Sequence, residues 1–97
     1  MKLRILSGDD VGKIVDLNQE GLTIGRAPDC DVVLSLNGVS RQHAHITFLN
    51  GVYRVEDAGS TNGVRVNGRK IEMPTEIKMG DRLGISDCIL LVTDASE

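Results

Sequence analysis

The feature that most constrains the fold is an alternation of apolar and polar residues with a period of two. Leu3 and Ile5 fall on one face of an N-terminal segment, and Val64 and Val66 flank Arg65 in a later one. Successive side chains of a strand point to opposite faces, so this pattern predicts half-buried strands. No stretch has a convincing helical period. The chain is therefore predicted to be all-β.

The turns between the alternating segments support this prediction. The dipeptide Asn-Gly occurs at 37–38, 50–51, 62–63 and 67–68. It favours the positive φ values that type I′ hairpin turns require. The clearest case is at 50–51, where alternating runs stand on both sides. The predicted strands cover about residues 2–7, 12–17, 21–26, 31–34, 44–49, 51–56, 63–66, 69–72, 81–85 and 88–93.

Short strands joined by short turns predict a β-sandwich of about ten to eleven mostly antiparallel strands, with no helix longer than one or two turns. The 97 residues suit a single domain over 1–97, and no linker or internal repeat divides them. Only the tail at 94–97 is expected to be frayed. We expect one bare domain, either free-standing or part of a larger protein.

The composition narrows the class of partner. The net charge is −3, the wrong sign for a protein that neutralises a nucleic-acid backbone along its length. Aromatic residues make up only 2% of the sequence, namely Phe48 and Tyr53, which removes the stacking platforms used for single strands. No apolar run approaches the roughly 20 residues that span a bilayer, and no signal peptide is apparent. We expect a cytoplasmic protein without nucleic-acid or membrane partners.

The two cysteines, Cys30 and Cys88, are far apart and match no metal or redox spacing. Two reduced thiols are the simplest interpretation, with a disulfide as the alternative. His43 and His45 are two residues apart and would share a face of a strand, as a zinc-binding pair can. No third ligand follows at a suggestive spacing, so the sequence predicts no metal and no cofactor.

Three polar segments fall in predicted turns, where a scaffold of strands would present them to solvent together. They are Gly25-Arg26, Ser40-Arg41-Gln42-His43 and Gly59-Ser60-Thr61-Asn62-Gly63. A fourth, Met79-Gly80-Asp81, precedes the last hairpin. Taken alone, each segment has an ordinary explanation as a surface charge, a loop residue or a hairpin turn. Their joint occurrence predicts a shared site.

In this order and at this spacing the segments resemble the forkhead-associated (FHA) family, whose pattern has Gly-Arg, then Ser-x-x-His, then Asn-Gly. The match covers essentially the whole sequence, including Val66-Asn67-Gly68 and the apolar strand after Gly80-Asp81. The resemblance implies an FHA-like sandwich, related to the SMAD fold, with recognition loops at one end. It also implies a module that binds phosphothreonine peptides in Ser/Thr-kinase signalling and is not an enzyme.

The resemblance assigns roles that agree with the chemistry of the side chains. Arg26, Ser40, Arg41 and Thr61 are expected to bind phosphate, which brings about −1.5 to −2 charges and three acceptor oxygens. Arg26 offers a planar fork for bidentate contact, and Thr61 offers a hydroxyl or a backbone N–H. Asn62 is expected to hydrogen-bond the backbone of the bound peptide. Three further residues are expected to be structural: Gly25 through a close turn before Arg26, His43 as an internal brace of the Ser40 loop, and Gly63.

Other functions remain as alternatives. The runner-up is a structural interaction domain that has the same sandwich but associates without phosphate, for example as a homodimer. A hydrolase is the weakest, because Ser40 and His43 are too close in sequence to suggest a triad and no Gly-x-Ser-x-Gly motif is present. We expect a monomer. In the family the loop before the Ser partly reads the third residue after phosphothreonine. Residues 37–39 carry no charge, so no acidic preference is predicted at that position.

Overall fold

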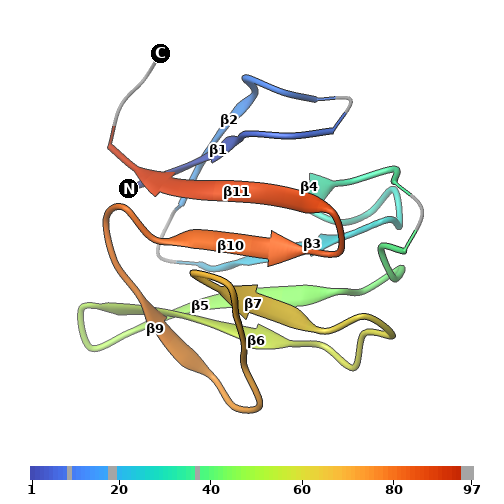
Figure 1. Cartoon of the computed structure of the whole chain (residues 1–97). Helices are drawn as coiled ribbons and strands as arrows, with labels where there is room; N and C mark the ends of the chain where they lie inside the picture. The colour runs from blue at the N-terminus through green and yellow to red at the C-terminus, as the bar shows by residue number, and fades with distance from the viewer. Residues whose placement is uncertain (9, 18–19, 37, 95–97) are drawn as a thin grey trace.

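The computed structural model describes residues 1–8, 10–17, 20–36 and 38–94, and this part of the protein forms two β-sheets and no helix (Figure 1). The first sheet consists of β1 (Lys2–Ile5), β2 (Ile14–Asp16), β7 (Val64–Val66), β8 (Arg69–Lys70), β10 (Arg82–Ile85) and β11 (Cys88–Thr93). The second consists of β3 (Leu22–Gly25), β4 (Val32–Val33), β5 (Ala44–Leu49), β6 (Val52–Asp57) and β9 (Thr75–Ile77).

The order of strands is β2-β1-β11-β10-β7-β8 in the six-stranded sheet and β4-β3-β5-β6-β9 in the five-stranded sheet. Only the β3–β4 pair is parallel among the strand pairs of the described residues, and the others are antiparallel. The prediction of an all-β sandwich with ten to eleven mostly antiparallel strands is confirmed. The tail residues 95–97 lie outside the described residues.

The core lies between the sheets and is built from aliphatic side chains, as the low aromatic content requires. Leu3, Ile24, Val55, Leu83 and Leu90 are each completely buried. The alternation read from the sequence has the predicted outcome in β7, where Val64 is buried and Arg65 is exposed. Burying a large aliphatic side chain contributes about 1.5–3 kcal/mol, so the sandwich can hold surface loops without a disulfide or metal.

One strand escaped the sequence prediction. Thr75–Ile77 forms β9 at the edge of the five-stranded sheet, where Tyr53 of β6 lies opposite Ile77. The segment is only three residues long and follows Pro74, so it carries almost no local alternation. It is a strand because β6 offers unpaired backbone groups and because Ile77 becomes buried. Several predicted strands were also too long, for example 12–17, of which only Ile14–Asp16 is in β2.

The Asn-Gly pairs do not all have the same role. At 50–51 and 67–68 both residues have positive φ and close two-residue hairpins, β5–β6 and β7–β8. At 62–63 only Gly63 has a positive φ, and the pair belongs to the longer connection from β6 to β7. That connection crosses from one sheet to the other. Residue 37 lies outside the described residues.

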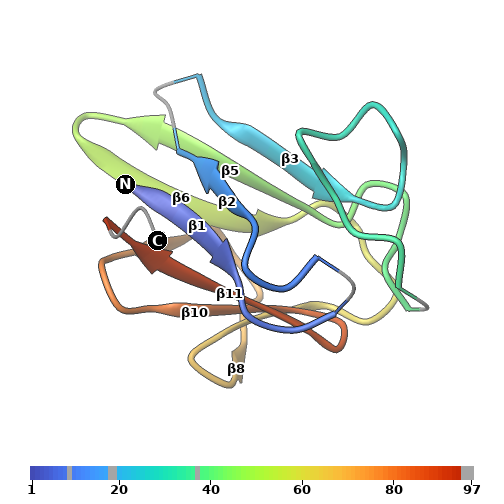
Figure 2. The ribbon, with the colours of Figure 1, turned by 90° about the horizontal axis from the view of Figure 1, so that it is seen from above.

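The connections β3–β4, β4–β5 and β6–β7 gather at one end of the sandwich, on the right in Figure 1 and again on the right in Figure 2, which is the view from above. These connections contain the three polar segments singled out in the sequence. Within the described ranges no helix has the length and apolar character needed to cross a bilayer.

Candidate functional site

An open hollow of about 490 Å3 lies among these three connections. Its lining comes from residues that are distant in the sequence: Arg26, Gly38, Val39, Ser40, Arg41, Gly59, Thr61 and Asn62. All five residues predicted to contact a phosphopeptide are in this set. We call it the recognition hollow. It contains two arginines and no carboxylate, so its local charge opposes the net negative charge of the protein.

Arg26 is held in place by hydrogen bonds within the protein itself. Its backbone N–H donates to the carbonyl of Ser40 at 2.9 Å, and its side-chain Nε donates to the carbonyl of Val39 at 3.1 Å. The Nε contact orients the guanidinium and turns the two terminal nitrogens into the available donors. A fork held in this way loses little side-chain entropy on binding an oxyanion.

Ser40 and Thr61 are coupled across two connections. The backbone N–H of Thr61 donates to Ser40 Oγ at 3.0 Å. One lone pair of the hydroxyl is thereby used, and its proton remains available to donate elsewhere. Thr61 uses its backbone N–H inside the protein, so its hydroxyl is the group left to offer a ligand. Thr61 itself is exposed.

Asn62 also bridges the same two connections. Its Nδ2 donates to the carbonyl of Gly38 at 2.8 Å. An amide has two N–H donors and one carbonyl acceptor, so this bond leaves a donor and an acceptor for the backbone of a peptide. Gly38 has a φ of 89°, and a Cβ there would lie 3.0 Å from Asn62 Nδ2.

The backbone of the Ser40–Arg41 segment crosses directly over Gly25. A Cβ on Gly25 would collide with the carbonyl oxygen of Arg41 and lie 3.0 Å from that of Ser40. Gly25 has no positive φ, so it is required for the space it leaves and not for an unusual backbone turn. The sequence interpretation of Gly25 as a close turn is corrected in this respect. The side chain of Arg41 is exposed at the edge of the hollow.

His43 lies beneath the hollow and is completely buried. Its Nδ1 accepts a hydrogen bond from the backbone N–H of Ser40 at 3.0 Å, and its Nε2 lies 2.8 Å from the carbonyl of Gly63. Because Nδ1 accepts, the ring proton is on Nε2 and is donated to Gly63. The imidazole thus joins the backbone of the β4–β5 and β6–β7 connections. Gly63 has a φ of 79°, and its Cα lies against the Lys70 side chain, since a Cβ would be 2.8 Å from Lys70 Cε.

Asp57 was not identified from the sequence, although it organises the third connection. Its Oδ1 accepts from the backbone N–H groups of Gly59 at 2.9 Å and Ser60 at 2.7 Å. Ser60 Oγ in turn accepts from the N–H of Gly63 at 2.9 Å. Burial by itself raises the pKa of Asp57, but the hydrogen bonds from Ser60 and Gly59 outweigh it and hold the pKa below its ordinary value of 3.8. The Asp-x-Gly-Ser spacing of an Asx turn was the signal available in the sequence.

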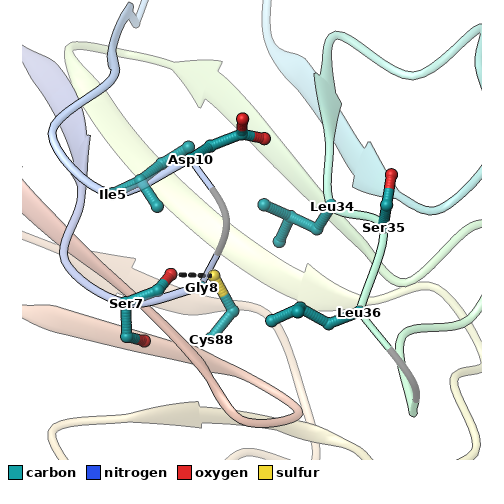
Figure 3. Close-up of a pocket in the computed structure, with 8 residues that line it drawn as sticks. All are labelled: Ile5, Ser7, Gly8, Asp10, Leu34, Ser35, Leu36 and Cys88. Carbon is teal, nitrogen blue, oxygen red and sulfur yellow. Dashed lines mark hydrogen bonds between the residues drawn. The ribbon is translucent and has the colours of Figure 1, made fainter.

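A second cavity lies elsewhere, between the β1–β2 connection, residues 34–36 and Cys88, but its volume is only about 110 Å3 (Figure 3). Organic ligands usually need 300 Å3 or more, roughly. Cys88 is buried beside it and donates from Sγ to the carbonyl of Ser7 at 3.2 Å, and burial raises the pKa of this thiol. Cys30 is also a free, buried thiol. Neither thiol lines the recognition hollow, but Cys30 Sγ donates to the carbonyl of Arg41, a lining residue, at 3.3 Å.

The histidine pair does not form a metal site. His43 is inaccessible and both ring nitrogens are engaged, whereas His45 is half-exposed with Nδ1 at 3.9 Å from Glu56. No group of three or more potential ligands occurs among the residues that the structure describes. His43 also cannot act as a base for Ser40, because its Nδ1 accepts from the Ser40 backbone and its Nε2 faces Gly63.

Fold and site together define a class: a β-sandwich that gathers cationic and hydroxyl donors on the loops at one end. Comparison with known proteins gives the class a name. The family model for the FHA domain matches residues 22–86. This protein therefore belongs to the FHA domain family.

Individual relatives support this family assignment. The sequence is 34% identical over 95 residues to an oxoglutarate dehydrogenase inhibitor of Corynebacterium jeikeium, covering 98% of this protein and 65% of the relative. The solved FHA domain of the CT664 protein from Chlamydia trachomatis superposes with a TM-score of 0.89 at 32% identity, covering 98% of this protein and 97% of that one. Mycobacterium tuberculosis EmbR in complex with a low-affinity phosphopeptide superposes with a TM-score of 0.85 at 28% identity, covering 99% of this protein and 25% of that one.

Curated relatives are longer than this sequence, which spans between 65% and 50% of the length of the first two that it matches. The FHA domain is the part that they share.

Proposed function

We propose that this protein is a phosphoprotein-binding module that recognises phosphothreonine in a segment of a partner protein, within Ser/Thr-kinase signalling. One observation carries the proposal. Arg26, Ser40, Arg41 and Thr61 come from three separate connections, and they line one hollow that no carboxylate enters. A purely structural domain has no need for this concentration of donors.

In the proposed complex four residues bind the phosphate, and two of them, Arg26 and Ser40, are already held by hydrogen bonds within the protein. The terminal guanidinium nitrogens of Arg26 donate to two phosphate oxygens, because Nε is held by Val39. Ser40 donates its hydroxyl proton, because Thr61 N–H occupies a lone pair of Oγ. The Thr61 hydroxyl and the Arg41 side chain complete the set. Charge-assisted hydrogen bonds of this kind contribute about 1.5–3 kcal/mol each.

Asn62 supplies the contact to the peptide itself. With one Nδ2 hydrogen bonded to Gly38, the other hydrogen and Oδ1 can pair with a backbone carbonyl and a backbone N–H of the ligand. Backbone pairing is independent of sequence, so Asn62 fixes the path of the peptide. Gly25, His43 and Gly63 act only through the shape of the connections.

The comparisons support this proposal at the level of the family. FHA domains bind phosphothreonine peptides, and EmbR, a solved relative, is in complex with a phosphopeptide. Another relative is named an inhibitor of a dehydrogenase, which is a regulatory role. A binding module without catalytic activity fits the site, since the buried His43 cannot accept a proton from Ser40. A cytoplasmic location and a monomeric state stay predictions.

The competing function is a structural interaction domain that binds its partner without phosphate. Titration calorimetry with a phosphothreonine peptide library and with the same library unphosphorylated separates the two. We expect heat of binding only for the phosphorylated library, weakening as salt rises, because screening acts over about 8 Å at physiological ionic strength. Equal binding of both libraries would support the structural domain.

The methyl group of threonine provides a finer prediction. The family resemblance implies an apolar niche for it, and Val39 is the apolar residue in the lining of the hollow. Burying one methyl contributes about 0.8 kcal/mol, so a phosphothreonine peptide should bind about fourfold more tightly than its phosphoserine twin, or more. Fluorescence anisotropy of the labelled pair measures this ratio. Equal affinities of the phosphothreonine and phosphoserine peptides would contradict the apolar niche.

A further inference from the structure

Two more hollows extend from the recognition hollow onto the outer face of the six-stranded sheet. The first, about 440 Å3, is lined by Gly38, Asn62, Arg65, Ser86 and Asp87. It shares Gly38 and Asn62 with the recognition hollow. We call it the middle hollow. It continues the surface on which a peptide held by Asn62 would lie.

The second of these two additional hollows, about 320 Å3, shares Arg65 and Ser86 with the middle hollow. The remaining lining residues are Asn67, Gly68, Arg82, Gly84 and Ile89. It lies over β7, β10 and β11, and we call it the sheet hollow. Because neighbours in this series share lining residues, the three hollows adjoin one another in a path that leads away from the proposed phosphate site.

The sheet hollow exists because β10 has a glycine in the middle of its outer face. Gly84 lies between Arg65 on β7 and Ile89 on β11 in the strand register. A Cβ on Gly84 would be 3.2 Å from Arg65 Cβ, so any larger side chain would fill the path. Arg82 is two residues before Gly84 and so points to the same face. Arg65 and Arg82 are diagonal neighbours across the β7–β10 pair, about 7–8 Å apart.

The charges of this surface call for an anionic occupant. Arg65 and Arg82 are both exposed, and the ion pairs found among the described residues involve other cations, namely the N-terminus, Lys2 and His45. No carboxylate lines the sheet hollow. Asp81, the nearest acidic residue along β10, accepts from Asn67 Nδ2 at 3.0 Å and from the N–H of Lys78 at 2.8 Å. The one carboxylate on the path is Asp87, in the middle hollow.

We propose that Arg65 and Arg82 bind aspartate or glutamate side chains of the same phosphopeptide, about four or five residues from its phosphothreonine. This inference rests on the proposed function, because the phosphate is what anchors the peptide at the start of the path. Thr61 and Arg65 are four residues apart and thus at most about 14 Å apart. An extended peptide covers that span in about four residues. Asp87 disfavours acidic residues closer to the phosphothreonine, which gives the ligand a neutral gap and then an acidic group.

The experiment uses three peptides, each with one phosphothreonine. One has neutral flanks, one has a pair of acidic residues four and five positions after the phosphothreonine, and one has the pair at the same distance before it. Fluorescence anisotropy measures their Kd values on the wild type and on Arg65→Gln/Arg82→Gln. The matched control is Lys13→Gln/Lys78→Gln, which removes the same charge at two exposed positions that line none of the three hollows.

We expect one acidic peptide to bind wild type about three- to tenfold more tightly than the neutral peptide, the size of two exposed ion pairs. That gain should vanish in Arg65→Gln/Arg82→Gln and persist in the lysine control. Which of the two peptides gains fixes the direction in which the ligand runs. If the neutral peptide binds but neither acidic peptide binds more tightly, the inference is wrong. It is also wrong if the gain in affinity survives in Arg65→Gln/Arg82→Gln. If no phosphopeptide binds at all, the proposed function fails as well.

Discussion

The recognition end of the sandwich has two layers that differ in almost every physical respect. The outer layer carries Arg26, Arg41 and Thr61, which are exposed and have polar groups directed to solvent. The inner layer is His43, completely buried with both ring nitrogens bonded to backbone groups. Both layers belong to one sequence motif. The motif thus combines residues that would contribute binding energy with residues that contribute only stability and shape, and substitutions should separate them.

The largest effect is expected for His43→Ala. The substitution leaves the Ser40 N–H and the Gly63 carbonyl without partners, at about 1–3 kcal/mol each. The free energy of unfolding should fall by about 2–5 kcal/mol, measured by urea denaturation. His45→Ala is the control, because His45 is half-exposed with only a 3.9 Å approach to Glu56, and it should change stability by less than about 1 kcal/mol. Equal stability of the two variants would contradict the stabilising role assigned to the inner layer.

Arg26→Ala should have the opposite profile. We expect the melting temperature to stay near that of wild type, since the side chain is exposed, and the affinity for a phosphothreonine peptide to fall at least tenfold. Arg26→Lys sharpens the test. Lysine keeps the charge but lacks the Nε contact to Val39 and the planar fork, so its affinity should lie between those of wild type and Arg26→Ala. Calorimetric titration of the three proteins measures this order. If Arg26→Lys bound the peptide as tightly as wild type, charge attraction alone would explain the contribution of Arg26.

Gly25→Ala should affect both layers at once. The new methyl group would meet the Arg41 carbonyl, so the Ser40–Arg41 backbone must shift. Overpacking of this kind costs about 1–3 kcal/mol of stability. Affinity should fall too, because Ser40 and Arg41 move with their backbone. Urea denaturation and peptide titration of the same sample measure the two losses, and a loss in only one of them would show that Gly25 does not couple the layers.

The smallest effect concerns Asp57 and pH. The pKa of Asp57 is lower in the folded protein than its ordinary value of 3.8, so the unfolded state binds the proton more tightly. Its contribution to stability is therefore complete above that value and is lost as the pH falls through the lower folded pKa. Asp57→Asn should be less stable than wild type at pH 6, and the difference should shrink below about pH 4. Thermal melts of both proteins from pH 6 to pH 3 test this, and a constant difference would contradict it.

Much of this protein was predictable from local sequence. The β5–β6 hairpin followed from Asn50-Gly51 between alternating runs, because backbone torsions there depend on two residues alone. The burial of Val64 and Val66 relative to Arg65 followed from the period of a strand. Strand β9 did not, because Thr75–Ile77 is extended through its pairing with β6 and carries little pattern of its own.

The composition of the candidate site could also be read from the sequence, with Arg26, Ser40, Arg41, Thr61 and Asn62 named in advance. Their internal contacts could not. That Thr61 N–H is used by Ser40 and that Arg26 is held through Val39 are consequences of how separate connections meet. The role of Asp57 is local to the β6–β7 connection and was missed although its Asx-turn spacing is visible in the sequence. From residues 37–39 the sequence predicted no acidic preference at the third residue after phosphothreonine, and this stays a prediction. The pairing of Arg65 with Arg82 across two strands was outside the reach of sequence reasoning.

The sequence by itself therefore determined which residues could form strands, which could turn, and which carried donors suited to a phosphate. Those properties belong to single residues and their immediate neighbours, through side-chain period, φ preference and chemistry. The tertiary structure alone decided which of these donors already have partners, why Gly25 must lack a side chain, and that Arg65 and Arg82 flank a hollow over Gly84. The physical reason is that hydrogen bonds and excluded volume act over a few ångströms in space, and the residues they join here are up to tens of positions apart in the sequence.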